Sequence, residues 1–161
     1  MYNIVVAGTG YVGLVAGVCF AEKGNNVVCV DVDQRKIDLM KSGISPIYEQ
    51  NLQEMMIKNY NEGRLNYTTN AKEAYKNADF IFIGVGTPER KDGSADLTYV
   101  YNVANEIAES VMKDCIVVVK STVPIGTNDE VEKMIRQNLK SNVKVTVVSN
   151  PEFLAQGTAV R

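Results

Sequence analysis

Three glycines near the start of the chain have a spacing typical of phosphate-binding loops. Gly8, Gly10 and Gly13 occur in the stretch GTGYVG, between strand-like residues 2–7 and helix-like residues 11–23. In such loops the first glycine permits a tight turn, the second lets a pyrophosphate approach the backbone, and the third lets helix and strand pack closely. The free N–H groups at the start of the helix attract the anion. A glycine turn without a ligand has the same spacing, so the role of this loop depends on a second feature.

An acidic residue supplies that second feature. Asp31 lies toward the end of the next strand-like segment, at the separation of roughly 20 residues where dinucleotide-binding folds carry a carboxylate for the adenosine ribose. Because a carboxylate repels the 2′-phosphate of NADP, the pair predicts NAD as the cofactor. Asp33 is a competing candidate, but alternation along a strand turns it to the other face, where it would cap the next helix. Lys36 could reach the ribose or a phosphate, although an exposed helix face also explains it.

Three later loops carry further candidate contacts. The stretch GVGTP, residues 84–88, combines glycines and a proline with the hydroxyl of Thr87. The stretch KSTV places the hydroxyls of Ser121 and Thr122 after another strand, and NPEFLAQ places Glu152 beside them. A carboxylate and a hydroxyl together could position a water molecule or a substrate hydroxyl. Ordinary βα loops and a surface or capping acid explain the same residues without a ligand.

Strand-like and helix-like segments alternate along the whole chain. Continuous apolar strands separated by helices predict an α/β fold, namely a Rossmann-type, doubly wound, mostly parallel six-stranded sheet with helices on both faces. Because ligands of such folds bind at the carboxyl ends of the strands, this fold brings the loops described above to one edge of the sheet. The expected strands are residues 2–7, 25–33, 64–70, 79–86, 115–122 and 143–150, and the expected helices are residues 11–23, 34–43, 51–63, 71–78, 96–113 and 128–140.

Composition limits the function classes. The 161 residues have 45% hydrophobic residues and a net charge of −2, which suits one domain with its own core and predicts neither nucleic-acid nor membrane binding. The chain has no histidine, so histidine triads and imidazole metal ligands are excluded, and no metal site is expected. Three scattered cysteines and no signal peptide fit buried, reduced thiols in a cytoplasmic protein.

Five motifs in order resemble the NAD-binding half of the UDP-glucose/GDP-mannose dehydrogenase family. They are GTGYVG, SPIYEQNL, GVGTP with DGSADLTYV, KSTVPIGT and NPEFLAQGTA, and together they span essentially the whole chain. Members of that family oxidise the C6 hydroxyl of a nucleotide sugar to a carboxylate, with two NAD⁺ and no metal. DGSADL and NPEFLAQGTA are most similar to members that act on UDP-glucose. The resemblance therefore implies an NAD-dependent nucleotide-sugar dehydrogenase, with UDP-glucose as its substrate.

The resemblance also assigns roles to residues. Thr122 and Glu152 match residues near the reacting carbon that hold a water molecule or relay a proton. Two departures stand out, since the family often has Tyr-Glu-Pro-Gly-Leu where residues 48–52 read YEQNL, and Gln156 replaces an acid and cannot act as a base. The implied cofactor contacts are Gly8, Thr9, Gly10, Tyr11, Val12, Gly13, Asp31, Lys36, Gly84, Val85, Gly86, Thr87, Pro88, Ser121, Thr122, Val123 and Gln156, and the implied substrate contacts are Glu152, Phe153, Leu154, Ala155 and Gln156.

The family's nucleophile has no match in this chain. Its covalent route runs through a cysteine thiolate, and none of Cys19, Cys29 and Cys115 stands at that position. We therefore expect residues 1–161 to be an NAD-binding fragment, without the central helix and the C-terminal UDP-sugar domain, that binds NAD and does not catalyse. The full-length protein is expected to be a homodimer. Two alternatives stay open, namely a GDP-mannose or UDP-N-acetylhexosamine dehydrogenase of the same family and a non-catalytic NAD-binding regulatory module.

Overall fold

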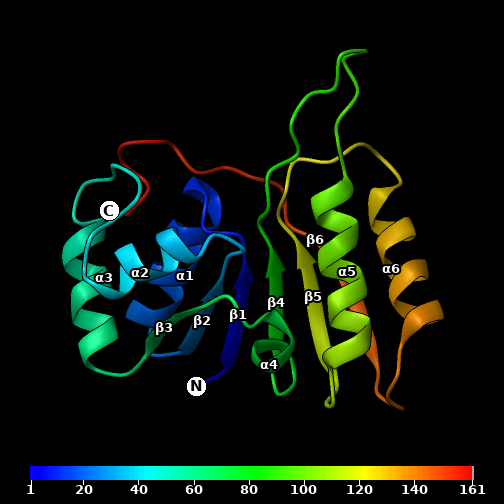
Figure 1. Ribbon diagram of the computed structural model, residues 1–161, viewed down its shortest axis with the longest axis horizontal. Helices are drawn as coiled ribbons and strands as arrows, with labels where there is room; N and C mark the ends of the chain where they lie inside the picture. Colours follow the sequence, from blue (N-terminus) through cyan, green and yellow to red (C-terminus); the bar gives the residue numbers. More distant parts are fainter. Residues whose placement is uncertain (161) are drawn as a thin grey trace.

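Six short apolar segments form one sheet in the order β3-β2-β1-β4-β5-β6, and every neighbouring pair is parallel. The computed structural model describes residues 1–160, so Arg161 lies outside the described residues (Figure 1). The predicted doubly wound fold is confirmed, with a sheet that is parallel throughout. The strands are β1 (Asn3–Ala7), β2 (Asn26–Val30), β3 (Leu65–Thr68), β4 (Phe80–Ile83), β5 (Cys115–Val119) and β6 (Val145–Ser149).

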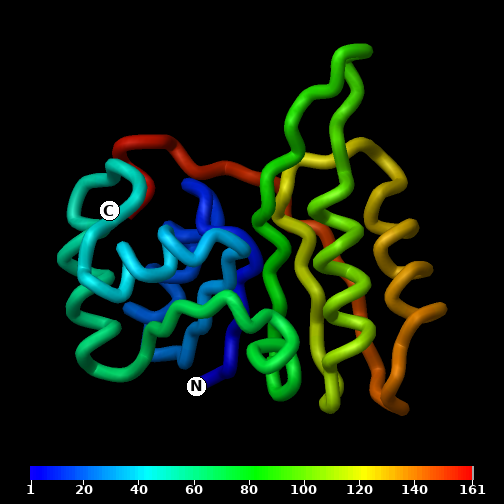
Figure 2. Tube along the Cα trace, in the orientation of Figure 1, coloured from blue at the N-terminus to red at the C-terminus, as the bar shows by residue number. Residues whose placement is uncertain are grey.

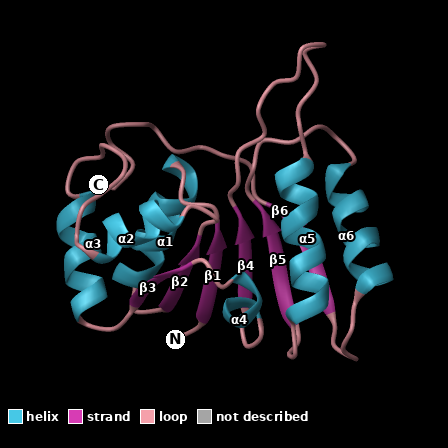
Figure 3. Ribbon diagram, in the orientation of Figure 1, coloured by secondary structure: helices cyan, strands magenta, loops and turns pink. Residues whose placement is uncertain are grey.

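Helices cover both faces of this sheet (Figure 3). Contacts with β1, β2 and β3 come from α1, α2 and α3, whereas α5 and α6 pack together and α6 lies against β6. The short α4 contacts β1, β2 and α5. No helix among residues 1–160 has both the length and the apolar character needed to cross a membrane. The helices are α1 (Tyr11–Glu22), α2 (Gln34–Lys41), α3 (Leu52–Asn61), α4 (Ala71–Tyr75), α5 (Thr98–Ser110) and α6 (Thr127–Asn138).

The central strand shows why the sheet is buried on both sides. Ile4 and Val6 belong to one hydrophobic cluster, with α1, whereas Val5 and Ala7 belong to the other, with α5. This alternation follows from the two-residue period of a strand. Each valine or isoleucine side chain among these contributes about 1.5–3 kcal/mol when it is fully buried. The uninterrupted apolar run of β1 is therefore what a two-layer core requires.

Local signals explain where the helices begin. Asp33 caps α2, since its Oδ1 accepts a hydrogen bond from the Arg35 N–H at 2.9 Å, and Asn70 caps α4 in the same way. The helix expected from residue 96 starts at Thr98, because Asp96 accepts hydrogen bonds from the Thr98 N–H and hydroxyl. Asn51, at the position where the related family often has glycine, adopts a left-handed φ of 65° that asparagine tolerates.

The carboxyl ends of the strands share one edge of the sheet, at the top in Figure 2. The glycine loop, the loop after β4 and the loop after β5 all start at this edge. After β6 the chain turns back and crosses the same edge toward α1 and α3, through residues 150–160 (Figure 2). Loops from distant parts of the sequence therefore meet there, as the fold predicted.

Two glycines of the first loop differ sharply in their surroundings. A Cβ atom on Gly13 would lie 2.0 Å from the Gly8 carbonyl oxygen, which is a backbone atom that cannot swing away. A Cβ atom on Gly10 would meet nothing within 4 Å, and the φ of Gly10 is −70°, which any residue adopts. Folding thus requires glycine at position 13 and does not require it at position 10.

We predict that Gly13→Ala lowers the free energy of unfolding by about 2–3 kcal/mol, because the added methyl group forces α1 away from β1. Urea denaturation of the purified chain measures this effect. Gly10→Ala is the matched control and should change the stability by less than about 1 kcal/mol. Equal midpoints for the two variants would contradict the packing argument.

Candidate functional site

The start of α1 forms an open cradle of backbone groups. Gly8 has a φ of 99°, and its N–H donates to the Val30 carbonyl at 2.8 Å, which joins the loop to the end of β2. Gly10 precedes the first turn of α1 and is exposed. A Cβ atom built on Gly10 would have no other atom within 4 Å. These features fit an anion held by helix N–H groups, as the sequence predicted.

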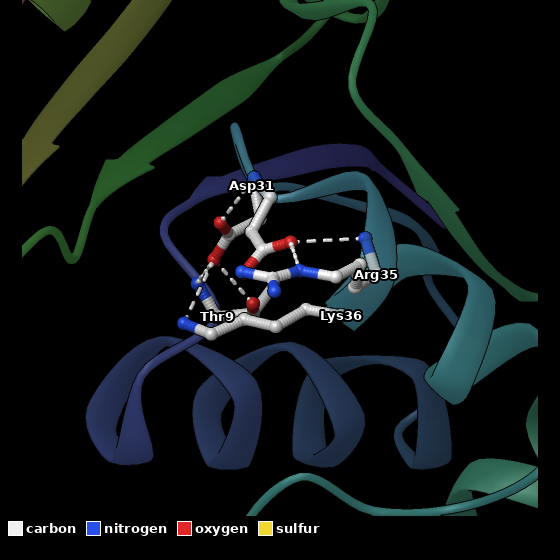
Figure 4. Close-up of polar contacts among 5 residues, drawn as sticks. Thr9, Asp31, Arg35 and Lys36 are labelled. Carbon is white, nitrogen blue, oxygen red and sulfur yellow. Dashed lines mark hydrogen bonds and ion pairs between the residues drawn. The ribbon is translucent and has the colours of Figure 1, made fainter.

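Asp31 contacts Thr9, the residue between Gly8 and Gly10 (Figure 4). Its Oδ2 accepts hydrogen bonds from the Thr9 N–H at 3.0 Å and from the Thr9 hydroxyl, and it lies 3.6 Å from Lys36 Nζ. Its Oδ1 accepts a hydrogen bond from the Asp33 N–H at 3.0 Å. A carboxylate has about four acceptor positions, so Oδ1 keeps one for a ligand hydroxyl.

The electrostatics of Asp31 favour the charged form. Burial alone would raise its pKa, since only 10% of its side chain is exposed. The hydrogen bonds from Thr9 and the Asp33 N–H, together with the charge of Lys36, outweigh burial and hold the pKa of Asp31 below its ordinary value. Thr9 is itself 1% exposed, and its hydroxyl donates a hydrogen bond to Asp31.

A cavity of about 440 Å³ continues from this carboxylate. It brings together three of the predicted groups, namely the glycine loop, Asp31 with Lys36, and the loop after β4. Its volume and its open glycine wall fit the adenosine half of a dinucleotide. The predicted site residues that line it are Gly8, Thr9, Gly10, Asp31, Lys36, Gly84, Val85 and Gly86.

The far wall of the cavity was missed from the sequence. It consists of one face of α5, with Tyr99, Asn102, Val103 and Glu106, and of residues around α4 that include Tyr75. Tyr75 is 1% exposed, and its hydroxyl has no hydrogen-bond partner among residues 1–160. The spacing of the α5 residues follows one helical face and could have indicated a wall, but these residues lie outside the loops at the strand ends.

The loops after β4 and β5 are tied to each other. The Ser121 hydroxyl donates to the Val85 carbonyl at 2.7 Å, and the Thr87 hydroxyl donates to the Thr122 carbonyl at 2.8 Å. The hydroxyls of Ser121 and Thr87, which the sequence predicted as ligand contacts, therefore donate to backbone carbonyls of the protein. The Thr122 side chain is exposed at the same edge. Residues 87–88 and 121–123 do not line the 440 Å³ cavity.

Glu152 has a different neighbour from the one expected. Its Oε2 lies 3.3 Å from Lys120 Nζ, and Lys120 also donates to Asn150 Oδ1 at 3.1 Å. The Lys120 side chain is only 11% exposed, so this ion pair is partly shielded from water. No hydrogen bond joins Glu152 to Ser121 or Thr122 among the described residues. Phe153 and Gln156 are exposed beyond it.

The three cysteines have inert surroundings. Burial raises the pKa of the Cys29 thiol to about 12 and that of Cys115 to about 11, and burial also raises the pKa of Cys19. A thiol in its neutral form is a weak nucleophile. These values fit the interpretation of all three as core thiols.

Comparison with protein families assigns the chain to a family. The model of the UDP-glucose/GDP-mannose dehydrogenase family, NAD binding domain, matches residues 2–161. The chain belongs to this family. Its cofactor is NAD, and the glycine loop, Asp31 and the adjoining cavity are the parts of the domain that fit an adenine dinucleotide.

Individual relatives agree with the family assignment. The UDP-glucose 6-dehydrogenase YwqF of Bacillus subtilis is 51% identical over 158 residues, which are 98% of this chain and 36% of the relative. The Rhizobium meliloti UDP-glucose 6-dehydrogenase is 52% identical over 159 residues, again 98% of this chain and 36% of the relative. The chain thus spans about a third of the length of these relatives.

Solved structures give the same result for the fold. The UDP-glucose dehydrogenase of the archaeon Pyrobaculum islandicum superposes with a TM-score of 0.94 at 40% identity, over 99% of this chain and 38% of that one. The GDP-mannose dehydrogenase of Pseudomonas aeruginosa superposes with a TM-score of 0.90, also at 40% identity, over 98% of this chain and 38% of that one.

We predict that Thr9→Val lowers the free energy of unfolding by about 1.5–3 kcal/mol at pH 7, because the Asp31 carboxylate loses a buried hydrogen bond. A lowered pKa contributes stability above the unfolded value of about 3.9, and that contribution disappears as the pH falls through the folded pKa. The difference between Thr9→Val and the unmodified chain should therefore shrink between pH 7 and pH 3 in urea titrations. A difference that does not depend on pH would show that Thr9 acts by packing alone.

Proposed function

We propose that this chain is the cofactor-binding part of a longer enzyme that oxidises UDP-glucose at its C6 hydroxyl. The observation that carries the proposal is the identity of 51–52% to two UDP-glucose 6-dehydrogenases along 98% of the chain. Because the chain spans about a third of those relatives, substrate turnover is assigned to the whole protein. The chain's own contribution is binding and orientation of the cofactor.

The proposed cofactor contacts and the proposed contacts near the sugar lie at two ends of the site. The N–H groups at the start of α1, reached past Gly10, hold the pyrophosphate, and Asp31 accepts a hydrogen bond from the adenosine ribose. When bound, NAD⁺ supplies the hydride acceptor. At the other end, the exposed hydroxyl of Thr122 and the carboxylate of Glu152 are proposed to hold a water molecule or a proton near the sugar. Lys120 keeps Glu152 in place.

The covalent chemistry is proposed to come from outside this chain. Oxidation of an alcohol to a carboxylate through an enzyme-bound acyl group needs a nucleophile. The thiols of the buried Cys29 and Cys115 and of the partly buried Cys19 have raised pKa values and lie in or against the core. The nucleophile is therefore assigned to the remaining length that the relatives have and this chain does not cover.

One alternative substrate is supported by a specific observation. The GDP-mannose dehydrogenase of P. aeruginosa has the same 40% identity to this chain as the P. islandicum UDP-glucose dehydrogenase. Sequence identity within a domain that binds only the cofactor says little about which sugar nucleotide the whole enzyme oxidises. The curated relatives favour UDP-glucose, and GDP-mannose is the second candidate.

The cofactor part of the proposal is tested by calorimetric titration of the chain with NAD⁺ and with NADP⁺. We expect NAD⁺ to bind more tightly, and Asp31→Asn to weaken NAD⁺ binding by about 10- to 100-fold while narrowing the difference between the two cofactors. Asp33→Asn is the matched control, because Asp33 caps α2 and asparagine caps equally well. Equal affinity for NAD⁺ and NADP⁺, or equal effects of the two variants, would count against the proposed role of Asp31.

The proposed substrate is tested with the full-length protein. We expect NAD⁺-dependent oxidation of UDP-glucose, with kcat/KM at least tenfold above that for GDP-mannose and UDP-N-acetylmannosamine, measured as NADH formation at 340 nm. A higher kcat/KM for another sugar nucleotide would show that UDP-glucose is not the preferred substrate. Absence of turnover with all three, together with intact NAD⁺ binding, would favour the regulatory module.

A further inference from the structure

Glu49 joins three parts of the chain that lie far apart in the sequence. It stands in the loop before α3, and its Oε2 accepts hydrogen bonds from the Tyr11 hydroxyl at 2.7 Å and from the Gly157 N–H at 2.7 Å. Its Oε1 accepts a hydrogen bond from the Ala159 N–H at 2.9 Å. Glu49 is 6% exposed, and no ion pair compensates its charge among the described residues. We call these contacts the Glu49 clasp.

Hydrogen bonds stabilise the charged form of Glu49. Burial alone would raise the pKa of Glu49, but the hydrogen bonds from Tyr11 and from the backbone of Gly157 and Ala159 outweigh it and lower the pKa. Hydrogen bonds to an ionised acceptor are about twice as strong as those between neutral groups. The carboxylate is therefore charged at neutral pH and is held by hydrogen-bond donors from two separate segments.

The position of the clasp connects the two ends of the site. Tyr11 is the first residue of α1 and directly follows Gly10, where the pyrophosphate is proposed to bind. Gly157 directly follows residues 152–156, the segment expected to face the substrate. Gly157 has a φ of 89°, so the backbone turns sharply there and presents its N–H groups to Glu49. Leu154 and Ala159 pack against the hydrophobic cluster of α1.

We propose that Glu49 is a positioning residue that fixes residues 152–156 relative to the start of α1, and that occupancy of the cofactor site strengthens this attachment through Tyr11. The proposal rests on the proposed function, since it assumes that the glycine loop binds NAD⁺. An anion at the start of α1 orders its first turn, including Tyr11, and an ordered Tyr11 is a better partner for Glu49. By thermodynamic reciprocity, the attached segment then favours the bound cofactor.

A merely structural role makes different predictions. Neither hydrophobic cluster contains Glu49, and none of its hydrogen bonds belongs to the sheet. Loss of the clasp should therefore release residues 152–160 and leave the sheet and the helices intact. If Glu49 served only to stabilise the fold, its removal would loosen the whole chain to the same extent.

The test is amide hydrogen exchange of the chain, read at Gly157 and Ala159 by NMR, with and without saturating NAD⁺. We expect NAD⁺ to slow exchange of both amides at least threefold. In Glu49→Ala they should exchange at least tenfold faster and no longer respond to NAD⁺, whereas the amides of β1 and β4 should keep their protection. Glu54→Ala is the matched control, since Glu54 is exposed on α3, and should behave like the unmodified chain.

Tyr11→Phe separates the two halves of the proposal and guards against misfolding of Glu49→Ala. It leaves the bonds from Gly157 and Ala159 to Glu49 in place, so basal protection should remain while the response to NAD⁺ is lost. Unchanged exchange in Glu49→Ala would refute the positioning role. An NAD⁺ response that survives in Tyr11→Phe would refute the coupling. If NAD⁺ does not bind at all, the proposed function and the coupling fail, and the ligand-free comparison still decides whether Glu49 positions the segment.

Discussion

The arrangement of the whole site depends on a close approach between three stretches of bare backbone. A Cβ on Gly8 would lie 2.6 Å from the Gly84 carbonyl oxygen, a Cβ on Gly13 would lie 2.0 Å from the Gly8 carbonyl oxygen, and a Cβ on Gly84 would lie 3.2 Å from the Gly13 Cα. Side chains are excluded from this junction, so β1, α1 and the end of β4 meet at one fixed distance. That distance places the first turn of α1 at the sheet edge and leaves Gly10 open beside it. The cavity and its carboxylate follow from this geometry.

The sequence predicts those features of the site that depend on local order along the chain. The glycine spacing and Asp31 are set by a strand, a turn, a helix and a second strand in succession, so their meeting point follows from the fold. Partners chosen by side-chain packing were not predictable in this way. The Thr9 hydroxyl binds Asp31, the Ser121 hydroxyl binds a backbone carbonyl of the neighbouring loop, and Glu152 lies beside Lys120. Each of these choices depends on where two loops stand relative to each other, which no local pattern encodes.

The surroundings of each titratable group determine whether it is charged. At the ribose end, Asp31 is held ionised by hydrogen-bond donors and by Lys36, while at the opposite end Glu152 is paired with the shielded Lys120. The glycine loop beside Asp31 presents backbone dipoles and no charged side chain, while the α5 wall of the cavity contributes Glu106. In the proposed function, an anionic pyrophosphate would meet the N–H groups at the start of α1. The thiols, in contrast, lie in the apolar core, where burial suppresses their ionisation.

The return of the last segment across the sheet edge also has a consequence for folding. Glu49 and its partners Gly157 and Ala159 are separated by 108 and 110 positions in the sequence, so their hydrogen bonds close a very long loop. We expect contacts of such high sequence separation to form late, after β5 and β6 have extended the sheet from its centre. On the ribosome, the glycine loop and Asp31 can assemble while the end of the chain is still being synthesised. In the proposed function, the cofactor end of the site is therefore expected to form before the end proposed to face the substrate, so that a folding chain acquires the means to hold a dinucleotide earlier than the means to present it to a second ligand.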